Sequence, residues 1–164
     1  MNGTGNGDVN SMVIIEGSTG VTGSDMLNSL IMYGGTDLSP DATLTDDNAQ
    51  YKVISKTLDS DSIGSVFSKL IDVPKGLYSV MIRMKVNNIA SNENAFTLSI
   101  RNSDPANTGI SRYIKPSMFN SADTYKTLGV VVENITGKLN VTLTINKAIG
   151  NTKVSVDYIA IAPA

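Results

Sequence analysis

Alternation of apolar and polar residues in the middle and at the end of the sequence is the feature that most constrains the fold. From Leu139 to Asn146, every second residue is Leu, Val or Ile, and the residues between them are Asn or Thr. Successive side chains of a β-strand point to opposite faces, whereas a helix would spread this apolar set around its axis. The segment from Leu77 to Val86 alternates in the same way. Both segments are predicted to be strands with one buried face.

Shorter or less regular strand candidates accompany these two segments, and turn-forming clusters such as Pro74-Lys75-Gly76 separate them. The seven further candidates are residues 11–16, 51–58, 65–71, 95–101, 110–115, 125–133 and 153–161. Many short strands at this spacing are typical of a sandwich or barrel, and 164 residues fill one core. We therefore predict an all-β fold, a two-sheet antiparallel β-sandwich of jelly-roll type. It comprises residues 11–164, and residues 1–10 form a flexible N-terminal tether.

One segment departs from the strand pattern. Ser24 is a suitable N-cap for one short helix near residues 25–33, and Gly34-Gly35 would end it. The apolar stretch Met26 to Met32 has more hydrophobic surface than such a helix needs, which favours burial against a neighbouring subunit. We therefore expect a homo-oligomer such as a trimer. The polar stretch 36–50 is predicted to be a long loop over one end of the sandwich.

Charge and residue content exclude several functions. The net charge of −2 provides no cationic surface for nucleic acid or an anionic membrane, so neither is an expected partner. The chain has no Cys and no His, which excludes thiolate metal sites and a Ser-His triad. A glycosidase needs two facing carboxyl groups, one of them with a raised pKa. The carboxylates of Asp37, Asp41, Asp46 and Asp47 lie in the polar stretch and are predicted to be solvated. We expect no enzyme activity and no required cofactor.

Three parts of the chain carry a family resemblance. They are Phe67 to Val86 with its Pro-Lys-Gly turn, Ile114 to Phe119 followed by Tyr125 to Glu133, and Val154 to Ile161. Their order resembles that of galactose-binding-like jelly rolls and related carbohydrate-binding modules. The resemblance covers roughly residues 50–164 and, more weakly, 11–20. It is one of pattern, so it implies the fold more strongly than the function.

The resemblance also implies a structural calcium ion between the first and the last strand. The matching positions are Glu16 and Asp157. Calcium prefers several oxygen ligands, and two carboxylates with nearby backbone carbonyls would begin such a site. Two alternatives remain open for Asp157, a solvated side chain or a turn-capping acceptor, and Glu16 would ordinarily be exposed at a strand end.

Sugar recognition normally combines aromatic faces with a few fixed polar groups. The carbohydrate-binding candidates are Tyr33, Tyr51, Tyr113 and Tyr125, with Arg112 and Asn107 as polar partners. Each tyrosine could instead pack structurally, because a tyrosine ring is often half buried for packing alone. The absence of Trp departs from the sugar-binding members of the family.

The Asn-, Ser-, Thr- and Gly-rich composition also resembles that of bacteriophage virion proteins such as head fibres, tail fibres and decoration proteins. The leading hypothesis is a non-catalytic virion surface module that assembles with other virion proteins and binds host-surface glycan. The alternative is an accessory carbohydrate-binding module of a secreted glycan-active enzyme. Either hypothesis places the domain on a virion surface or in an extracellular setting.

Overall fold

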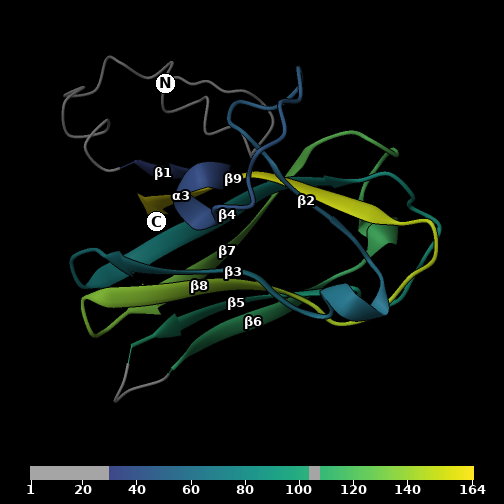
Figure 1. The fold of residues 1–164 in the computed structure, drawn as a ribbon. Coiled ribbons are helices and arrows are strands. Elements are labelled where there is room, and N and C mark those ends of the chain that lie inside the picture. Colours follow the sequence, from purple (N-terminus) through teal and green to yellow (C-terminus); the bar gives the residue numbers. More distant parts are fainter. Residues whose placement is uncertain (1–29, 104–107) are drawn as a thin grey trace.

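Two antiparallel sheets stacked face to face make up the protein in a computed structural model, which describes residues 30–103 and 108–164 (Figure 1). The five-stranded sheet has the order β1-β9-β4-β7, with β2 also paired to β9, and the four-stranded sheet has the order β3-β8-β5-β6. The strands are β1 (Ile31–Gly34), β2 (Ile54–Thr57), β3 (Gly64–Asp72), β4 (Gly76–Val86), β5 (Phe96–Asn102), β6 (Gly109–Ile114), β7 (Lys126–Asn134), β8 (Lys138–Ile145) and β9 (Lys153–Pro163). This arrangement confirms the predicted β-sandwich of jelly-roll type.

Eight of the nine predicted strands coincide with β2 to β9. The remaining candidate, residues 11–16, and the expected tether at residues 1–10 lie outside the described residues. The two most regular predictions follow the pleat as expected. In β8, Leu139, Val141, Leu143 and Ile145 are fully buried, while the Asn and Thr residues between them are partly exposed. The alternation in the sequence therefore corresponds to the buried and exposed faces of the strand.

The predicted helix near residues 25–33 is wrong over its last turn, where the chain forms β1. This strand pairs antiparallel with β9, from Ile31 opposite Ile161 to Gly34 opposite Tyr158. Its side chains point alternately to the two faces of the sheet. Ile31 packs against the main core, and Met32 packs on the other face. The edge of β9 takes up the backbone hydrogen-bonding groups of this segment, so tertiary pairing overrides the local helix signal. Residues 25–29 lie outside the described part of the chain.

Gly34-Gly35 does not end a helix as predicted: Gly34 is the N-cap of a helix, and Gly35 is its first residue. The single-turn helix α3 (Gly35–Leu38) begins here, and the side chain of Asp37 accepts a hydrogen bond from the N–H of Gly34 at 3.1 Å. A Cβ atom on Gly35 would lie 2.1 Å from the carbonyl oxygen of Lys52. Glycine is required here because the backbone of the following loop passes this close. Two 3-10 turns, η1 (Ser60–Ser62) and η2 (Pro116–Met118), complete the helical elements of the described residues.

The core fills the space between the two sheets, and both sheets contribute fully buried side chains. The five-stranded sheet supplies Val80, Ile82, Met84, Val156, Ile159 and Ile161, and the four-stranded sheet supplies Phe96, Leu98, Ile100, Leu139, Val141, Leu143 and Ile145. The outer faces remain as the surfaces on which a site can be built. Within the described residues, no helix has the length and apolar character to cross a membrane.

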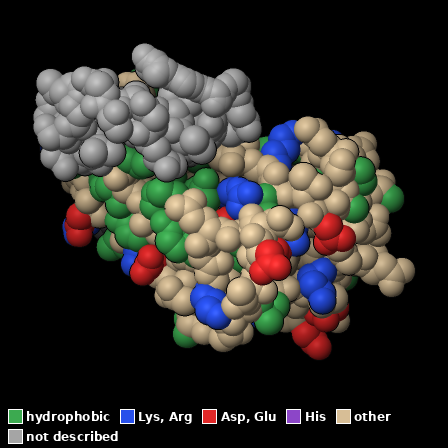
Figure 2. All heavy atoms as spheres, turned by 90° about the horizontal axis from the view of Figure 1, so that it is seen from above, with side chains coloured by type: hydrophobic (Ala, Val, Ile, Leu, Met, Phe, Trp, Pro, Cys, Tyr) green, Lys and Arg blue, Asp and Glu red, His purple; other side chains and the backbone are tan. Residues whose placement is uncertain are grey.

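Loop 39–53, defined here as the segment between α3 and β2, passes over the outer face of the five-stranded sheet. An isolated bridge between Leu44 and Val53 joins the two arms of the loop to each other. The loop contacts β4 through the Asp46 side chain and β9 through the backbone N–H groups of Gln50 and Tyr51. Seen from this side, hydrophobic side chains gather in one region of the surface, and charged side chains are spread over the remainder (Figure 2). The predicted loop over residues 36–50 therefore begins only after α3, and it lies across a sheet face, not over one end of the sandwich as predicted.

Candidate functional site

Asp157 lies at an irregularity in β9. Arg83 of β4 pairs with Tyr158 and Met84 pairs with Val156, so Asp157 is the extra residue of a β-bulge. On the other side of β9, the partner changes at the same residue, from β2 (up to Val156) to β1 (from Tyr158). Asp157 therefore lies opposite the gap between β1 and β2, where neither strand pairs with β9. In this gap its side chain can accept hydrogen bonds from backbone N–H groups of another segment.

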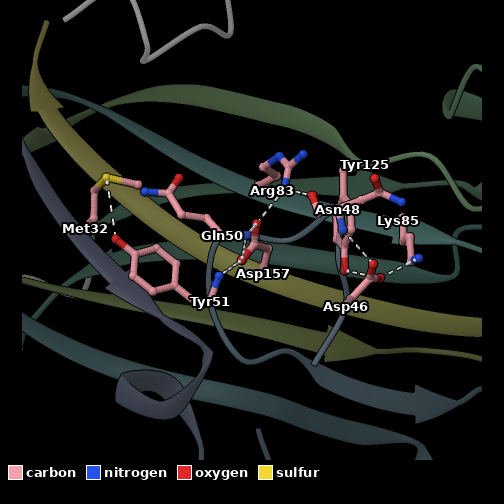
Figure 3. Close-up of polar contacts among 9 residues, drawn as sticks. All are labelled: Met32, Asp46, Asn48, Gln50, Tyr51, Arg83, Lys85, Tyr125 and Asp157. Carbon is pink, nitrogen blue, oxygen red and sulfur yellow. Dashed lines mark hydrogen bonds and ion pairs between the residues drawn. The ribbon is translucent and has the colours of Figure 1, made fainter. Parts of the chain in front are cut away.

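The carboxylate of Asp157 is completely buried, and three donors surround it (Figure 3). The backbone N–H groups of Gln50 and Tyr51 donate to it at 2.8–3.1 Å, and Nη1 of Arg83 lies 2.5 Å from Oδ2. The same Arg83 nitrogen donates to the carbonyl oxygen of Asn48 at 3.0 Å. Burial of a charge is costly unless it is paired and hydrogen-bonded, and both conditions are met here.

A second cluster fastens loop 39–53 farther along the sheet. Asp46 forms an ion pair with Lys85 at 2.7 Å and accepts a hydrogen bond from the hydroxyl of Tyr125 at 3.0 Å. The Tyr125 ring also packs against two cations: Cζ of Arg83 lies 4.4 Å and Nζ of Lys85 lies 4.9 Å from its centroid. Asp46 is thus a fastening group, contrary to the expectation that it would be solvated like the other loop aspartates.

The pKa values in this cluster follow from its contacts. The hydrogen bond from Lys85, followed by that from the backbone of Asn48, lowers the pKa of Asp46 to about 2. Burial, followed by the hydrogen bond to Asp46, raises the pKa of the Tyr125 hydroxyl above its usual range. A general acid in glycoside hydrolysis needs a carboxyl group whose pKa is raised. The contacts of Asp46 move its pKa in the opposite direction.

Three of the tyrosines proposed to bind sugar have structural contacts. Tyr125 lies in the cluster just described. Tyr51 packs edge-on against Tyr158, with ring centroids 5.9 Å apart, and its hydroxyl lies 4.0 Å from the sulfur of Met32. Tyr33 packs against the main core, and Nζ of Lys69 lies 5.2 Å from its ring centroid. These rings are held within the five-stranded sheet and its covering loop.

The surroundings of Asp157 do not fit the calcium site implied by the resemblance. Both carboxylate oxygens already accept hydrogen bonds, and the Arg83 guanidinium occupies the position where a cation would bind. A second cation beside Arg83 would be repelled. Among the described residues, no group of three or more Asp, Glu, His or Cys side chains is placed to hold a metal ion. Glu16, the other proposed ligand, lies outside the described residues.

The outer face of the four-stranded sheet carries a different set of side chains. Tyr113 of β6 projects from this face, and 62% of its surface is exposed. It stands opposite Thr97 of β5, which in turn stands opposite Thr144 of β8. The next outward row along the strands is Ser111, Ser99 and Thr142. The face therefore carries rows of hydroxyl groups with an aromatic ring at one corner, and the exposed Leu70 of β3 lies opposite Asn140.

This face is hollowed at the end remote from Tyr113. The hollow has a volume of about 370 Å³, and Ser68, Arg101, Asn140 and Thr142 are among its lining residues. Ser68 and Thr142 both donate a hydrogen bond to Oδ1 of Asn140, at 2.9 and 3.0 Å. Beneath the rim, Asn102 is fully buried and binds the backbone of Thr108, Glu133 and Ile135, so it fixes the end of β5.

Arg112 and Tyr113, both predicted to bind sugar, leave β6 on opposite faces. They are adjacent in β6, where Tyr113 pairs with Thr97 on the outer face and Arg112 pairs with Leu98 on the inner side. Consecutive residues of a strand point to opposite faces, so the two side chains diverge. Both residues nevertheless border one cleft of about 190 Å³ between β6 and β7. Asn107, the other polar candidate, lies outside the described residues.

Arg101 and the hollow were not predicted from the sequence, although the polar character of the outward face was visible in it. The alternation of Asn140, Thr142 and Thr144 shows that β8 has a polar outward face. It does not show that β5 lies beside β8, which brings Arg101 opposite Asn140. That juxtaposition depends on strand order and register, which alternation alone does not specify.

The chain matches no known family model and no curated protein, whereas its fold is similar to that of several solved structures. One is the CBM36-1 domain of a multidomain xylanase from the hindgut metagenome of Trinervitermes trinervoides, with 14% identity and a TM-score of 0.54 over 82% of this chain and 98% of that one. Another is a carbohydrate-binding module CBM36 in complex with calcium and xylotriose, with 14% identity and a TM-score of 0.52 over 80% of this chain and 99% of that one.

The insecticidal delta-endotoxin Cry8Ea1 from Bacillus thuringiensis is equally similar, with 14% identity and a TM-score of 0.52. There the match covers 82% of this chain and 24% of the toxin. At these identities the similarity shows the fold, a jelly roll of the type found in carbohydrate-binding modules. Because a toxin contains the same fold, function must be argued from the surface of this chain.

Proposed function

We propose that this chain is a non-catalytic module that binds glycan on the outer face of its four-stranded sheet. The observation that carries this proposal is the exposure of Tyr113 beside rows of hydroxyl and amide side chains. An exposed aromatic ring can stack on the C–H face of a sugar, and nearby polar groups can bind the sugar hydroxyls. The similarity of the fold to carbohydrate-binding modules supports the same choice.

The arrangement of the other tyrosines strengthens the choice of this face. Tyr51 and Tyr125 are engaged in fastening loop 39–53, and Tyr33 packs against the core. Tyr113 is the tyrosine with a large exposed fraction among the described residues. A ligand that stacks on an aromatic ring would therefore bind on β6, where the flat face of the sheet leaves room for an extended chain.

The proposal includes the two settings predicted from the sequence. A virion surface module and an accessory module of a secreted glycan-active enzyme would both be non-catalytic domains with an exposed face that binds glycan. We favour the virion surface, in line with the Asn-, Ser- and Thr-rich outward faces. Detection of the chain in purified phage particles would support this setting, and its detection as part of a glycan-active enzyme would support the alternative. Sedimentation velocity tests the expected homo-oligomer.

Binding of purified protein to a glycan array, followed by titration of the best ligand, tests the function. Replacement of Tyr113 by Ala should weaken binding about tenfold, whereas Tyr113→Phe should retain most of the affinity. Leu77→Ala is the matched control, because Leu77 is 51% exposed but belongs to the five-stranded sheet. An array without a binding glycan, or full affinity in Tyr113→Ala, would rule out this function.

A further inference from the structure

Arg101 is held in a fixed position on the proposed glycan face. Its Nε lies 3.3 Å from the hydroxyl of Ser99 on its own strand, and its Nη2 lies 3.1 Å from the hydroxyl of Ser111 on β6. The two hydroxyls are themselves 3.4 Å apart. The guanidinium is therefore anchored across two strands at the edge of the hollow, although the side chain remains exposed.

The hollow beside Arg101 is lined by hydroxyl and amide groups and by the exposed Leu70. Oδ1 of Asn140 is already occupied by the hydroxyls of Ser68 and Thr142, which leaves its amide nitrogen to donate. Asn140 stands directly opposite Arg101 in the register of β5 and β8. No Asp or Glu is among the described residues that line the hollow, and Arg101 has no ion pair with a carboxylate of the described chain.

A fixed guanidinium and a free amide N–H₂ group, without a carboxylate, form a site for a negatively charged oxygen group. We infer that the hollow binds a carboxylate or sulfate of the glycan, so that the ligand is an acidic polysaccharide. This inference rests on the proposed function and specifies its substrate class. The chain's net charge of −2 is small, and salt screens charges farther away than about 10 Å. The local cation therefore dominates at the hollow.

The distance between the hollow and Tyr113 determines how much of the glycan is bound. Tyr113 pairs with Thr97, and Arg101 lies four residues farther along β5. Four residues of a strand span roughly 13 Å, which is longer than a single sugar ring. A ligand that stacks on Tyr113 and places an acidic group at Arg101 must therefore contain several linked sugars.

Titration calorimetry with three probes tests this inference. The probes are an oligogalacturonate of six sugars, the same oligosaccharide with its carboxyl groups reduced to alcohols, and a sulfated galactan oligosaccharide of similar length. The variants are Arg101→Gln and its control Lys153→Gln, which removes one positive charge from an exposed position in β9 of the other sheet. Tyr113→Ala reports on glycan binding itself, and thermal melting verifies that each variant is folded.

The wild-type protein should bind at least one acidic probe about tenfold more tightly than the reduced probe, and added salt should reduce this preference. Arg101→Gln should abolish the preference, and Lys153→Gln should retain it. Preference for the carboxylate or for the sulfate identifies the acidic group. Equal binding of acidic and reduced probes, or an unchanged preference in Arg101→Gln, would overturn the inference and leave the proposed function intact. Failure of all probes and of every glycan on the array would overturn both.

Discussion

Asp157 combines two roles that usually belong to different residues. In the gap between β1 and β2 it accepts hydrogen bonds from the N–H groups of Gln50 and Tyr51. It also forms a buried ion pair with Arg83. Removal of one partner from such a pair leaves a buried charge that water cannot reach. The effect on stability should therefore be larger than that of a surface ion pair.

Replacement of Arg83 by Met should lower the free energy of unfolding by about 2 to 3 kcal/mol, because the buried carboxyl group of Asp157 would lose its ion-pair partner and retain only backbone donors. The Arg83 side chain is 27% exposed, which places the effect at the lower end for a buried pair. Lys147→Met is the control: it breaks the exposed pair with Glu93 and should have no measurable effect.

Urea unfolding in calcium and in chelator provides the measurement. Strong stabilisation of the wild type by calcium, lost in Asp157→Asn, would contradict our structural assignment of Asp157.

At the scale of an element, loop 39–53 depends on Asp46 for one of its attachments to β4. The folded pKa of Asp46, about 2, lies below its ordinary value of 3.8. The contribution of Asp46 to stability is therefore complete above about pH 4 and is lost as the pH falls to about 2. Asp46→Asn should flatten the pH dependence of unfolding over this range and lower stability at neutral pH. Asp41→Asn, whose carboxylate is 63% exposed, controls for the change in net charge. Identical acid profiles for wild type and Asp46→Asn would show that the loop does not depend on this carboxylate.

The strands could be predicted from the sequence because alternation reports directly on a face that is buried or exposed. β8 is the clearest case, since its inward residues are aliphatic and the residues between them are Asn or Thr. In β4 burial also alternates from Tyr78 to Val86, although Met81 faces outward. β1 could not be predicted, because its four residues form a strand only through pairing with β9. Of the predicted site residues, Tyr113 stands on an open face, and Arg112 leaves β6 on the other face; the assignment of both to sugar binding stays a prediction. Arg101 becomes visible only when β5, β6 and β8 are placed side by side.

At the scale of the whole molecule, the two sheets share one core and should unfold together. The chain has no Trp, and five of its six tyrosines belong to the five-stranded sheet or the segments beside it. Tyrosine near-ultraviolet dichroism therefore reports mainly on that sheet, whereas Leu143 is buried in the other one.

Leu143→Ala should lower the free energy of unfolding by about 3 kcal/mol through lost contacts and a residual cavity. Its tyrosine and far-ultraviolet transitions should shift by the same amount, because a shared core couples both sheets in one cooperative transition. Val131→Ala, at a residue 51% exposed on the outer face, should leave both transitions nearly unchanged. A far-ultraviolet shift without a tyrosine shift would mean that the sheets unfold independently.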